Sequence, residues 1–191
     1  MRKLIATEYL TLDGVMEAPG SEASLGERGS WSFLFSSEEH RQFKWDELLA
    51  SDVLLLGRTT YEIFAAAWPS RTGEFADRMN SLPKYIVSST LDKAEWNNSY
   101  LINDTTHLVD EVARLKKQPG KDILLTGSAD LFHTLREHNL IDEYHFMVYP
   151  IILGTGKRLF KEGSSMSLNL IESRTLRSGV IVLIYHSQAK A

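Results

Sequence analysis

The stretch Asp52–Phe64, "DVLLLGRTTYEIF", contains an abrupt change of pattern. Its first part is a continuously apolar run that stops at Gly57, and such a run is typical of a strand buried on both faces. Arg58, Thr59 and Thr60 follow, and apolar residues then return with helical spacing. A helix that begins directly after a strand presents free backbone N–H groups and a partial positive charge, so this junction is a candidate anion site.

The same pattern recurs at residues 122–127, "DILLTG", where a second apolar run ends in glycine. Ser128 and Ala129 follow Gly127, and residues 129–139 have helical spacing. Parallel strands of an open α/β sheet bring their carboxyl ends to one edge, where ligands bind. The two junctions are therefore expected to lie close together.

A third predicted strand, residues 84–90, ends in the hydroxyl-rich group Ser88, Ser89 and Thr90. Together with the two glycine junctions, it offers small polar strand ends that suit a phosphorylated nucleotide. The alternative is purely structural, because glycine, serine and threonine also form turns and cap helices. The sequence contains neither G-x-G-x-x-G nor a P-loop that would decide between the two.

The remaining segments place these junctions in an α/β fold. Further strands are expected at residues 3–10, 99–103, 143–153, 167–176 and 179–187, and further helices at 36–51, 59–68 and 104–120. Ser36 and Glu39 have the spacing of a capping box before the first of these helices. Alternation of strands and helices followed by strands alone predicts a mainly parallel sheet with antiparallel strands added late. Residues 11–35 form a long loop, which is usually functional or mobile.

The composition restricts the class of protein. The chain has 191 residues, 43% of them hydrophobic, and a formal net charge of -4, which favours one domain spanning residues 1–191 and no nucleic-acid partner. It has no cysteine, and its six histidines have no metal-ligand spacing, so no metal site is expected. Neither a signal peptide nor a membrane span is evident, and the expected location is the cytoplasm.

The segments "LLLGRTTYE", "YIVSST", "ILLTGSADLF" and "DEYHFMVYPIILGTGKRLF" occur in the order and spacing of the dihydrofolate reductase-like superfamily. They most resemble the C-terminal reductase domain of bifunctional deaminase-reductases of riboflavin biosynthesis, and "TLDGVMEAPG" resembles that group's first strand and loop. The resemblance covers nearly the whole chain. It implies a single α/β domain with a mixed, mainly parallel sheet flanked by helices, NADPH as the cofactor, and a homodimer formed with the late strands.

The resemblance also implies roles for individual residues. Arg58 would face the adenosine 2′-phosphate of NADPH, and Thr60 would lie by the pyrophosphate. The other positions that match the family's cofactor motifs are Gly57; Ser88 and Ser89 by the ribose phosphate; Gly127, Ser128 and Ala129 by the pyrophosphate; and Leu12, Asp13 and Gly14 in the loop that closes over the nicotinamide.

The catalytic carboxylate has no clear counterpart. In dihydrofolate reductases an acidic residue on the first helix holds the pterin and assists protonation, but the family spacing counted back from Gly57 leads to Arg41. The remaining candidates are Glu17 in the first loop and Glu39 on the predicted helix, where a carboxylate can equally be a cap or part of a solvated face. Folate is therefore not the expected substrate.

Two functions are compatible with these observations. The first is an NADPH-dependent reductase that delivers hydride to a small heterocyclic or carbonyl substrate, with the riboflavin-pathway 5-amino-6-ribosylaminouracil phosphate implied by the resemblance. The chain has no deaminase zinc motif, so it would correspond to the reductase half alone. The alternative is a non-catalytic NADP(H)- or nucleotide-binding protein that keeps the fold without the chemistry. A fold relative that takes another phosphorylated ligand would show no affinity for NADPH.

Overall fold

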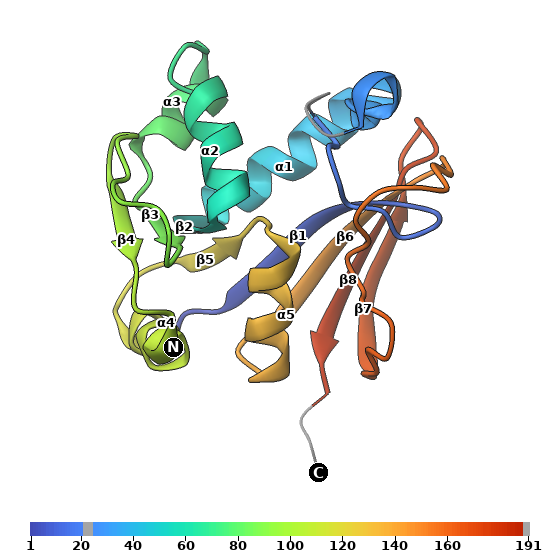
Figure 1. The fold of residues 1–191 in the computed structure, drawn as a ribbon. Helices are drawn as coiled ribbons and strands as arrows, with labels where there is room; N and C mark the ends of the chain where they lie inside the picture. Colours follow the sequence, from blue (N-terminus) through green and yellow to red (C-terminus); the bar gives the residue numbers. More distant parts are fainter. Residues whose placement is uncertain (21–24, 189–191) are drawn as a thin grey trace. The chain divides into compact units, whose positions relative to one another are not determined.

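The computed structural model describes residues 1–20 and 25–188 (Figure 1). The chain divides into two compact units: unit 1 comprises Met1–Ala6 and Trp45–Asp142, and unit 2 comprises Thr7–Lys44 and Glu143–Ala191. Strand β1 (Leu4–Thr11) and helix α1 (Glu38–Ala50) each begin in one unit and end in the other.

Unit 1 contains a parallel sheet. Its strands are β2 (Ser51–Gly57), β3 (Lys84–Val87), β4 (Ser99–Ile102), β5 (Asp122–Leu125) and the first residues of β1. They follow the order β4-β3-β2-β5-β1 with parallel neighbours. Side chains alternate between the faces of a strand, yet Leu54, Leu55 and Leu56 of β2 are all buried. Burial on both faces explains why this strand is a continuous apolar run.

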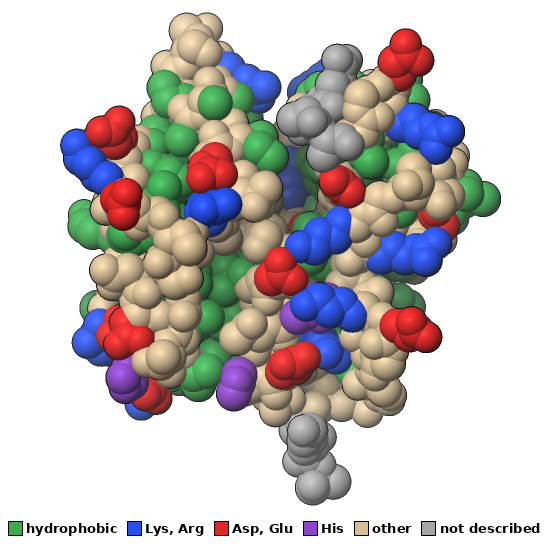
Figure 2. Space-filling view, in the orientation of Figure 1, with side chains coloured by type: hydrophobic (Ala, Val, Ile, Leu, Met, Phe, Trp, Pro, Cys, Tyr) green, Lys and Arg blue, Asp and Glu red, His purple; other side chains and the backbone are tan. Residues whose placement is uncertain are grey.

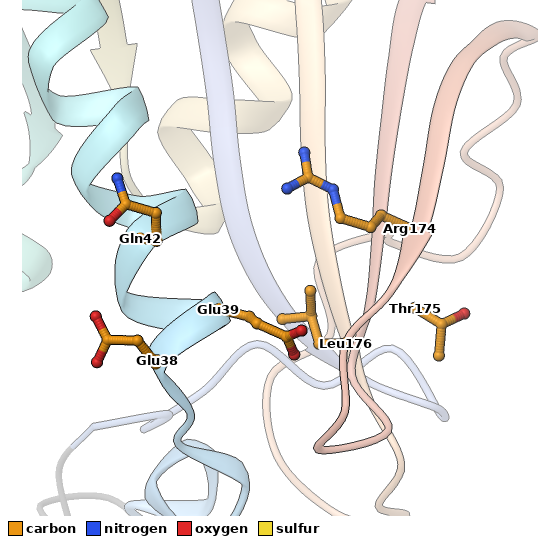
Figure 3. Close-up of a pocket in the computed structure, with 6 residues that line it drawn as sticks. All are labelled: Glu38, Glu39, Gln42, Arg174, Thr175 and Leu176. Atoms are coloured by element: carbon orange, nitrogen blue, oxygen red, sulfur yellow. The ribbon is translucent and has the colours of Figure 1, made fainter.

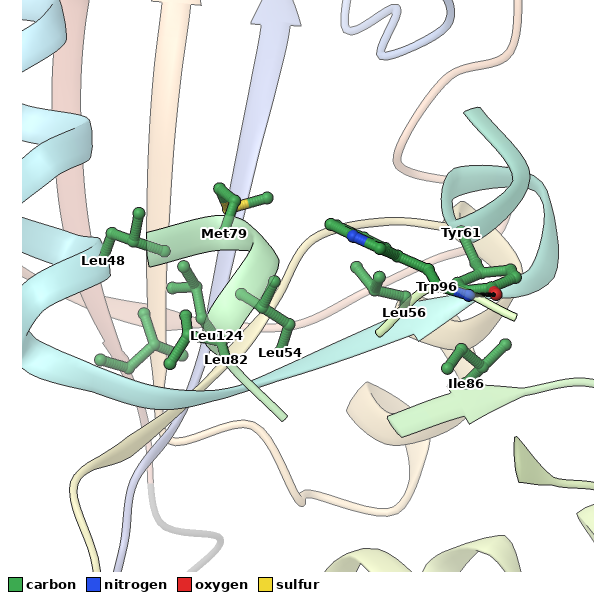
Figure 4. Packing of buried hydrophobic residues seen from close by; sticks show 10 residues of the cluster. Leu48, Leu54, Leu56, Tyr61, Met79, Leu82, Ile86, Trp96 and Leu124 are labelled. Carbon is green, nitrogen blue, oxygen red and sulfur yellow. Dashed lines mark hydrogen bonds between the residues drawn. The ribbon is translucent and has the colours of Figure 1, made fainter. Parts of the chain in front are cut away.

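The helices of unit 1 are α2 (Arg58–Ala67), α3 (Glu74–Ser81), α4 (Leu108–Lys117) and α5 (Ala129–Glu137), with a 3₁₀ turn η3 (Thr105–His107) before α4. In Figure 1, α2 and α3 lie on one side of these strands and α4 on the other. Figure 4 shows the core beneath α2 and α3, where Tyr61 and Met79 pack with Leu54, Leu56 and Ile86 of the sheet. These contacts fix the end of β2 and the start of α2.

Unit 2 is built differently. Its strands follow the order β1-β6-β8-β7, and β8 (Ile181–Ser187) runs antiparallel to both β6 (Glu143–Tyr149) and β7 (Leu168–Thr175). Two 3₁₀ helices, η1 (Gly26–Arg28) and η2 (Trp31–Phe35), interrupt the long loop after β1. The core of the unit is mainly aromatic and β-branched, with Trp31, Phe43, Met147, Tyr149, Leu176, Val180 and Val182 buried together.

The structure confirms the predicted fold class, an α/β fold with parallel strands first and antiparallel strands at the C-terminal end. Helix α3 was not predicted, because its eight residues bury only Ala76 and Met79 and give no clear periodicity. The strand expected at 143–153 ends at Tyr149, since Pro150 has no N–H for a ladder. Ser37 rather than Ser36 caps α1, its Oγ accepting a hydrogen bond from the N–H of His40 at 3.1 Å. A single domain over residues 1–191 stays a prediction.

Charge is mixed in sign on the face shown in Figure 2, where Lys and Arg side chains are interspersed with Asp and Glu. No helix within the described residues is both long and apolar enough to cross a membrane.

Candidate functional site

The two predicted strand-to-helix junctions lie against each other in unit 1. The N–H of Gly57, at the end of β2, donates to the carbonyl of Gly127 at 3.1 Å. Gly57 also pairs with Val87 in the neighbouring strand, so Ser88 follows at the same edge of the sheet. The structure therefore brings the three predicted strand ends together.

Both glycines have a packing role of their own. A Cβ on Gly57 would lie 2.9 Å from the backbone nitrogen of Ser128, closer than real side chains approach. Gly127 has φ +51°, and a Cβ there would lie 2.5 Å from Oγ1 of Thr60. The apolar run thus stops at Gly57 at least partly because Ser128 lies against it. The Gly127–Ser128 peptide bond is cis.

Two helices begin at this edge. Helix α2 starts at Arg58 and α5 at Ala129. The N-cap residue of α2 is Gly57, which has no side chain to cap with, and the side chain of Ser128 makes no capping hydrogen bond to α5 within the described chain. The first N–H groups of both helices are consequently not satisfied by a side-chain cap. The first turn of α5 carries Asp130, whereas that of α2 carries no acidic residue, so the start of α2 is the better anion site.

The side chain of Arg58 extends from the start of α2 to the end of β3. Its Nη1 donates to Oγ1 of Thr90 at 2.8 Å, and its Nε lies 3.6 Å from a carboxylate oxygen of Glu62. About half of the side chain remains exposed, at 48%. The guanidinium is thus held at the junction while still able to form hydrogen bonds to a phosphate.

The hydroxyl residues differ in what they offer. Ser88 is buried, and its Oγ accepts hydrogen bonds from the N–H groups of Thr90 and Leu91 at 3.2 and 3.0 Å. Ser88 therefore shapes the turn after β3, as expected if this hydroxyl residue has a purely structural role. Ser89, Thr90 and Thr59 are exposed, and their predicted contact with a ligand stays a prediction.

Asp13 and Gly14 belong to unit 2 and lie in the turn after β1. Asp13 accepts hydrogen bonds from Thr11 Oγ1 at 2.6 Å and from the N–H of Gly154 at 2.8 Å. The bond from Thr11, aided by the N–H groups of Gly154 and Leu153, holds the pKa of Asp13 below its usual value. Gly14 has φ +78°, and its carbonyl accepts from the N–H of Leu159 at 3.0 Å. The Asp13 carboxylate thus fastens the 11–15 turn to residues 153–154.

The two candidate carboxylates also bind backbone groups. Glu17 accepts the N–H of Lys157 at 2.6 Å, and Glu39 accepts the N–H of Arg177 at 2.8 Å. The expected position, Arg41, lies on the surface, where it forms an ion pair with Glu38 at 2.6 Å. None of these arrangements has the geometry of a carboxylate reserved for a substrate.

Glu39 lines an open pocket of about 340 Å³ in unit 2, shown in Figure 3. The other lining residues are Glu38, Gln42, Arg174, Thr175 and Leu176. Its charged side chains already have partners, because Glu38 pairs with Arg41 and Arg174 with Glu172. The pocket is therefore a weak candidate for a ligand site.

One cluster of polar side chains was missed by the sequence analysis. Tyr9 of β1, His40 of α1 and Tyr149 of β6 meet in unit 2, with His40 Nε2 at 2.7 Å from the Tyr9 hydroxyl. These residues are far apart in sequence and form no motif. The only available signal was the alternation in β1, which places Thr7 and Tyr9 on one face of the strand.

Within residues 1–20 and 25–188 there is no group of three or more His, Cys, Asp or Glu side chains arranged to hold a metal ion. The described residues offer two helix starts at one sheet edge in unit 1 and a hydrogen-bonded cluster of Tyr and His side chains in unit 2.

Comparison with known proteins extends these observations. A family profile described as the RibD C-terminal domain matches residues 2–182. Among curated proteins, the uncharacterized protein YyaP of Bacillus subtilis is 30% identical over 191 residues, which covers 97% of this chain and 95% of that protein.

Two solved structures share the fold. A putative riboflavin biosynthesis protein from Shewanella sp. PV-4 matches with a TM-score of 0.74 at 20% identity, over 98% of this chain and 99% of that one. Dihydrofolate reductase from Enterococcus faecalis, complexed with NADP(H) and RAB-propyl, matches with a TM-score of 0.64 at 15% identity, over 98% and 97% of the two chains. At these identities the likeness is one of fold.

Proposed function

The chain belongs to the RibD C-terminal domain family, and from this premise we propose that it is an NADPH-dependent reductase of a small heterocyclic or carbonyl substrate. The observation that carries the proposal is the meeting of two helix starts beside the half-exposed Arg58 in unit 1. Uncapped N–H groups suit a pyrophosphate, and a guanidinium suits a terminal phosphate.

The residues of unit 1 fit the phosphates of such a cofactor. Arg58, Ser89 and Thr90 would bind the 2′-phosphate, since all three are exposed at the end of β3 or the start of α2. Gly57, Thr59, Thr60, Gly127, Ser128 and Ala129 would line the pyrophosphate. Asp13 and Gly14 would act through the 11–15 turn, whose shape the Asp13 carboxylate maintains. When bound, the nicotinamide would supply hydride, and the protein would supply binding, orientation and exclusion of water.

The substrate class follows from the family and from the named function of one structural neighbour, a putative riboflavin biosynthesis protein. A riboflavin-pathway aminouracil phosphate is therefore the first substrate to test. The reaction takes place in the cytoplasm in this proposal, where NADPH is available.

The second candidate function is binding of NADP(H) or another nucleotide without turnover. It is favoured by the engagement of Glu17 and Glu39 with backbone N–H groups, which leaves neither as an evident proton donor. Tight binding of NADPH with no oxidation of it by any aminouracil, pterin or carbonyl compound would support this alternative.

The proposal includes a homodimer formed through β7 and β8. Strand β7 ends the order β1-β6-β8-β7, and the exposed fractions of Leu170, Ile171 and Ile181 are 53%, 55% and 37%. Leu170 and Ile171 are exposed apolar residues of the end strand itself, and such an edge favours pairing with a second copy. Sedimentation of the wild type as a dimer and of Ile171→Glu as a monomer would support this assembly, and a monomeric wild type would exclude it.

The function is tested by titrating the chain with NADPH, NADP⁺ and NADH while following tryptophan fluorescence. We expect NADPH to bind more tightly than NADH. Arg58→Ala should weaken the binding of NADPH about 10- to 100-fold, which corresponds to the loss of one charged hydrogen-bonding group. Arg114→Ala is the matched control, because Arg114 is an exposed helical arginine of unit 1 paired with Glu111. Equal affinities for the two dinucleotides, or an equal loss in both variants, would contradict the phosphate site.

A further inference from the structure

Unit 2 contains a hydrogen-bonded cluster of three rings from separate elements. Nε2 of His40 lies 2.7 Å from the hydroxyl of Tyr9 and 3.4 Å from the hydroxyl of Tyr149. The rings of Tyr9 and Tyr149 are 5.3 Å apart between centroids, and Trp31 packs edge-on against Tyr149 at 5.0 Å. The imidazole is thus fixed between two hydroxyl groups inside the aromatic core of the unit.

The ammonium group of Lys44 lies over the ring of Tyr9. Nζ of Lys44 lies 5.4 Å from the centroid of the Tyr9 ring and donates to Oγ1 of Thr7 at 2.7 Å. His40 and Lys44 are four residues apart in α1 and therefore share one helix face, which meets the face of β1 that carries Thr7 and Tyr9. A positive charge beside a phenol favours the phenolate that remains when the proton leaves.

The three members of the cluster differ in exposure to solvent. Tyr149 is fully buried, and burial raises its pKa, so it remains a protonated hydrogen-bond partner of His40. His40 is also buried, with an exposed fraction of 9%. Tyr9 is the one aromatic residue of this trio that is partly exposed.

On the premise of the proposed reductase function, we propose that the hydroxyl of Tyr9 is the proton donor to the substrate, positioned by His40 and Lys44. A carbonyl that gains a hydride at carbon must gain a proton at oxygen. The O–H bond of Tyr9 breaks, a new O–H bond forms on the substrate oxygen, and the electron pair stays on Tyr9 as tyrosinate beside Lys44. Tyr9, the partly exposed member of the cluster, is then reprotonated by solvent, while His40 holds its hydroxyl in place through their 2.7 Å contact.

This assignment supplies the acid that no carboxylate provides. It also explains why α1 has Arg41 at the position expected for an acid, since the neighbouring His40 is the residue that faces the interior. The rival interpretation is a network that only stabilises unit 2. In that case loss of the Tyr9 hydroxyl would lower stability and leave the chemistry unchanged.

The first test compares Tyr9→Phe with the wild type in NADPH oxidation, using the aminouracil phosphate and 9,10-phenanthrenequinone as probes. We expect kcat to fall about 100-fold or more, the usual contribution of a general acid, with unchanged NADPH affinity. Tyr100→Phe is the control, because Tyr100 is an exposed tyrosine of β4 stacked on Tyr85. Turnover retained in Tyr9→Phe would overturn the assignment alone, whereas a wild type inactive with both probes would overturn the reductase function and the assignment with it.

The second test needs no substrate. Ultraviolet difference spectroscopy of the unliganded protein follows tyrosinate formation with pH, and the difference between the titration curves of the wild type and Tyr9→Phe isolates the ionisation of Tyr9. Lys44→Met keeps the Tyr9–His40 contact and should shift the ionisation of Tyr9 to higher pH, which a purely structural role would not do. If Tyr9→Phe fails to fold, Lys44→Met decides, and an unchanged titration in that variant would overturn the proposal.

Discussion

Unit 1 and unit 2 each enclose a basic side chain, but they satisfy it in different ways. In unit 1 the ammonium of Lys84 donates to the backbone carbonyls of Asn80, Leu82 and Asn97 at 2.7–2.9 Å. In unit 2 the imidazole of His40 lies between the side-chain hydroxyls of Tyr9 and Tyr149, 2.7 and 3.4 Å from its Nε2. Lys84 is thus held by backbone carbonyls, and His40 by side chains from separate elements.

The candidate sites repeat this contrast. The junctions of unit 1 consist of glycines, helix starts and short hydroxyl residues, whereas the cluster of unit 2 consists of rings. A site built from backbone is sensitive to changes of shape, and a site built from side chains can lose one group at a time. Substitutions in the two units should therefore differ in cost.

The largest loss of folding stability is expected for Lys84→Met. Lys84 is fully buried, and its Nζ lies 4.1 Å from the centroid of the Trp96 ring. The variant keeps the volume of the side chain but leaves three buried carbonyls without their donor, so the free energy of unfolding should fall by about 3 kcal/mol or more. Urea denaturation measures this loss, and a loss below about 1 kcal/mol would show that the carbonyls find other donors.

The stability lost in Lys84→Met should also depend on pH, because the pKa of Lys84 is lowered in the folded protein. Burial lowers its pKa to about 8, whereas the unfolded chain keeps the proton up to about pH 10.4. Below pH 8 both states are protonated. Between the folded and unfolded pKa values of Lys84, the unfolded state holds the lysine proton more often than the folded state does. The free energy of unfolding of the wild type relative to Lys84→Met should therefore rise with pH in this range. A difference that stays constant or falls between pH 8 and pH 10 would contradict the lowered pKa.

A smaller loss of folding stability than in Lys84→Met is expected for Gly57→Ala. The added Cβ would lie 2.9 Å from the backbone nitrogen and Cβ of Ser128, and backbone cannot move aside as a flexible side chain can. We expect unfolding to become easier by about 2 kcal/mol, together with weaker NADPH binding, because both junctions must shift. Gly20→Ala is the control, since among the described residues a Cβ there meets only Phe33 Cζ, at 3.6 Å. Equal stability of the two variants would show that the junctions are loosely packed.

The same contrast explains how much could be predicted from the sequence. The junctions at Gly57 and Gly127 were predictable, because strand, glycine and helix follow one another along the chain and parallel strands end at one edge. The close approach of Gly57 to Ser128 was not, since it depends on the register of β2 and β5. The Tyr9–His40–Tyr149 cluster was also hidden, because its members are joined only by the packing of β1, α1 and β6.

The smallest effect is expected for Tyr149→Phe, and it separates the two roles of the ring cluster. Phenylalanine keeps the ring contacts with Trp31 and Tyr9 and removes only the hydroxyl that lies 3.4 Å from His40. The loss of one hydrogen bond of that length should cost about 1 kcal/mol or less in the free energy of unfolding. Since Tyr9 retains its contact with His40, the tyrosinate of Tyr9 should still form in the ultraviolet titration of the unliganded protein. A loss above about 2 kcal/mol in urea denaturation, or disappearance of that tyrosinate, would mean that the two tyrosines act as one inseparable network and that unit 2 is no more tolerant of single changes than unit 1.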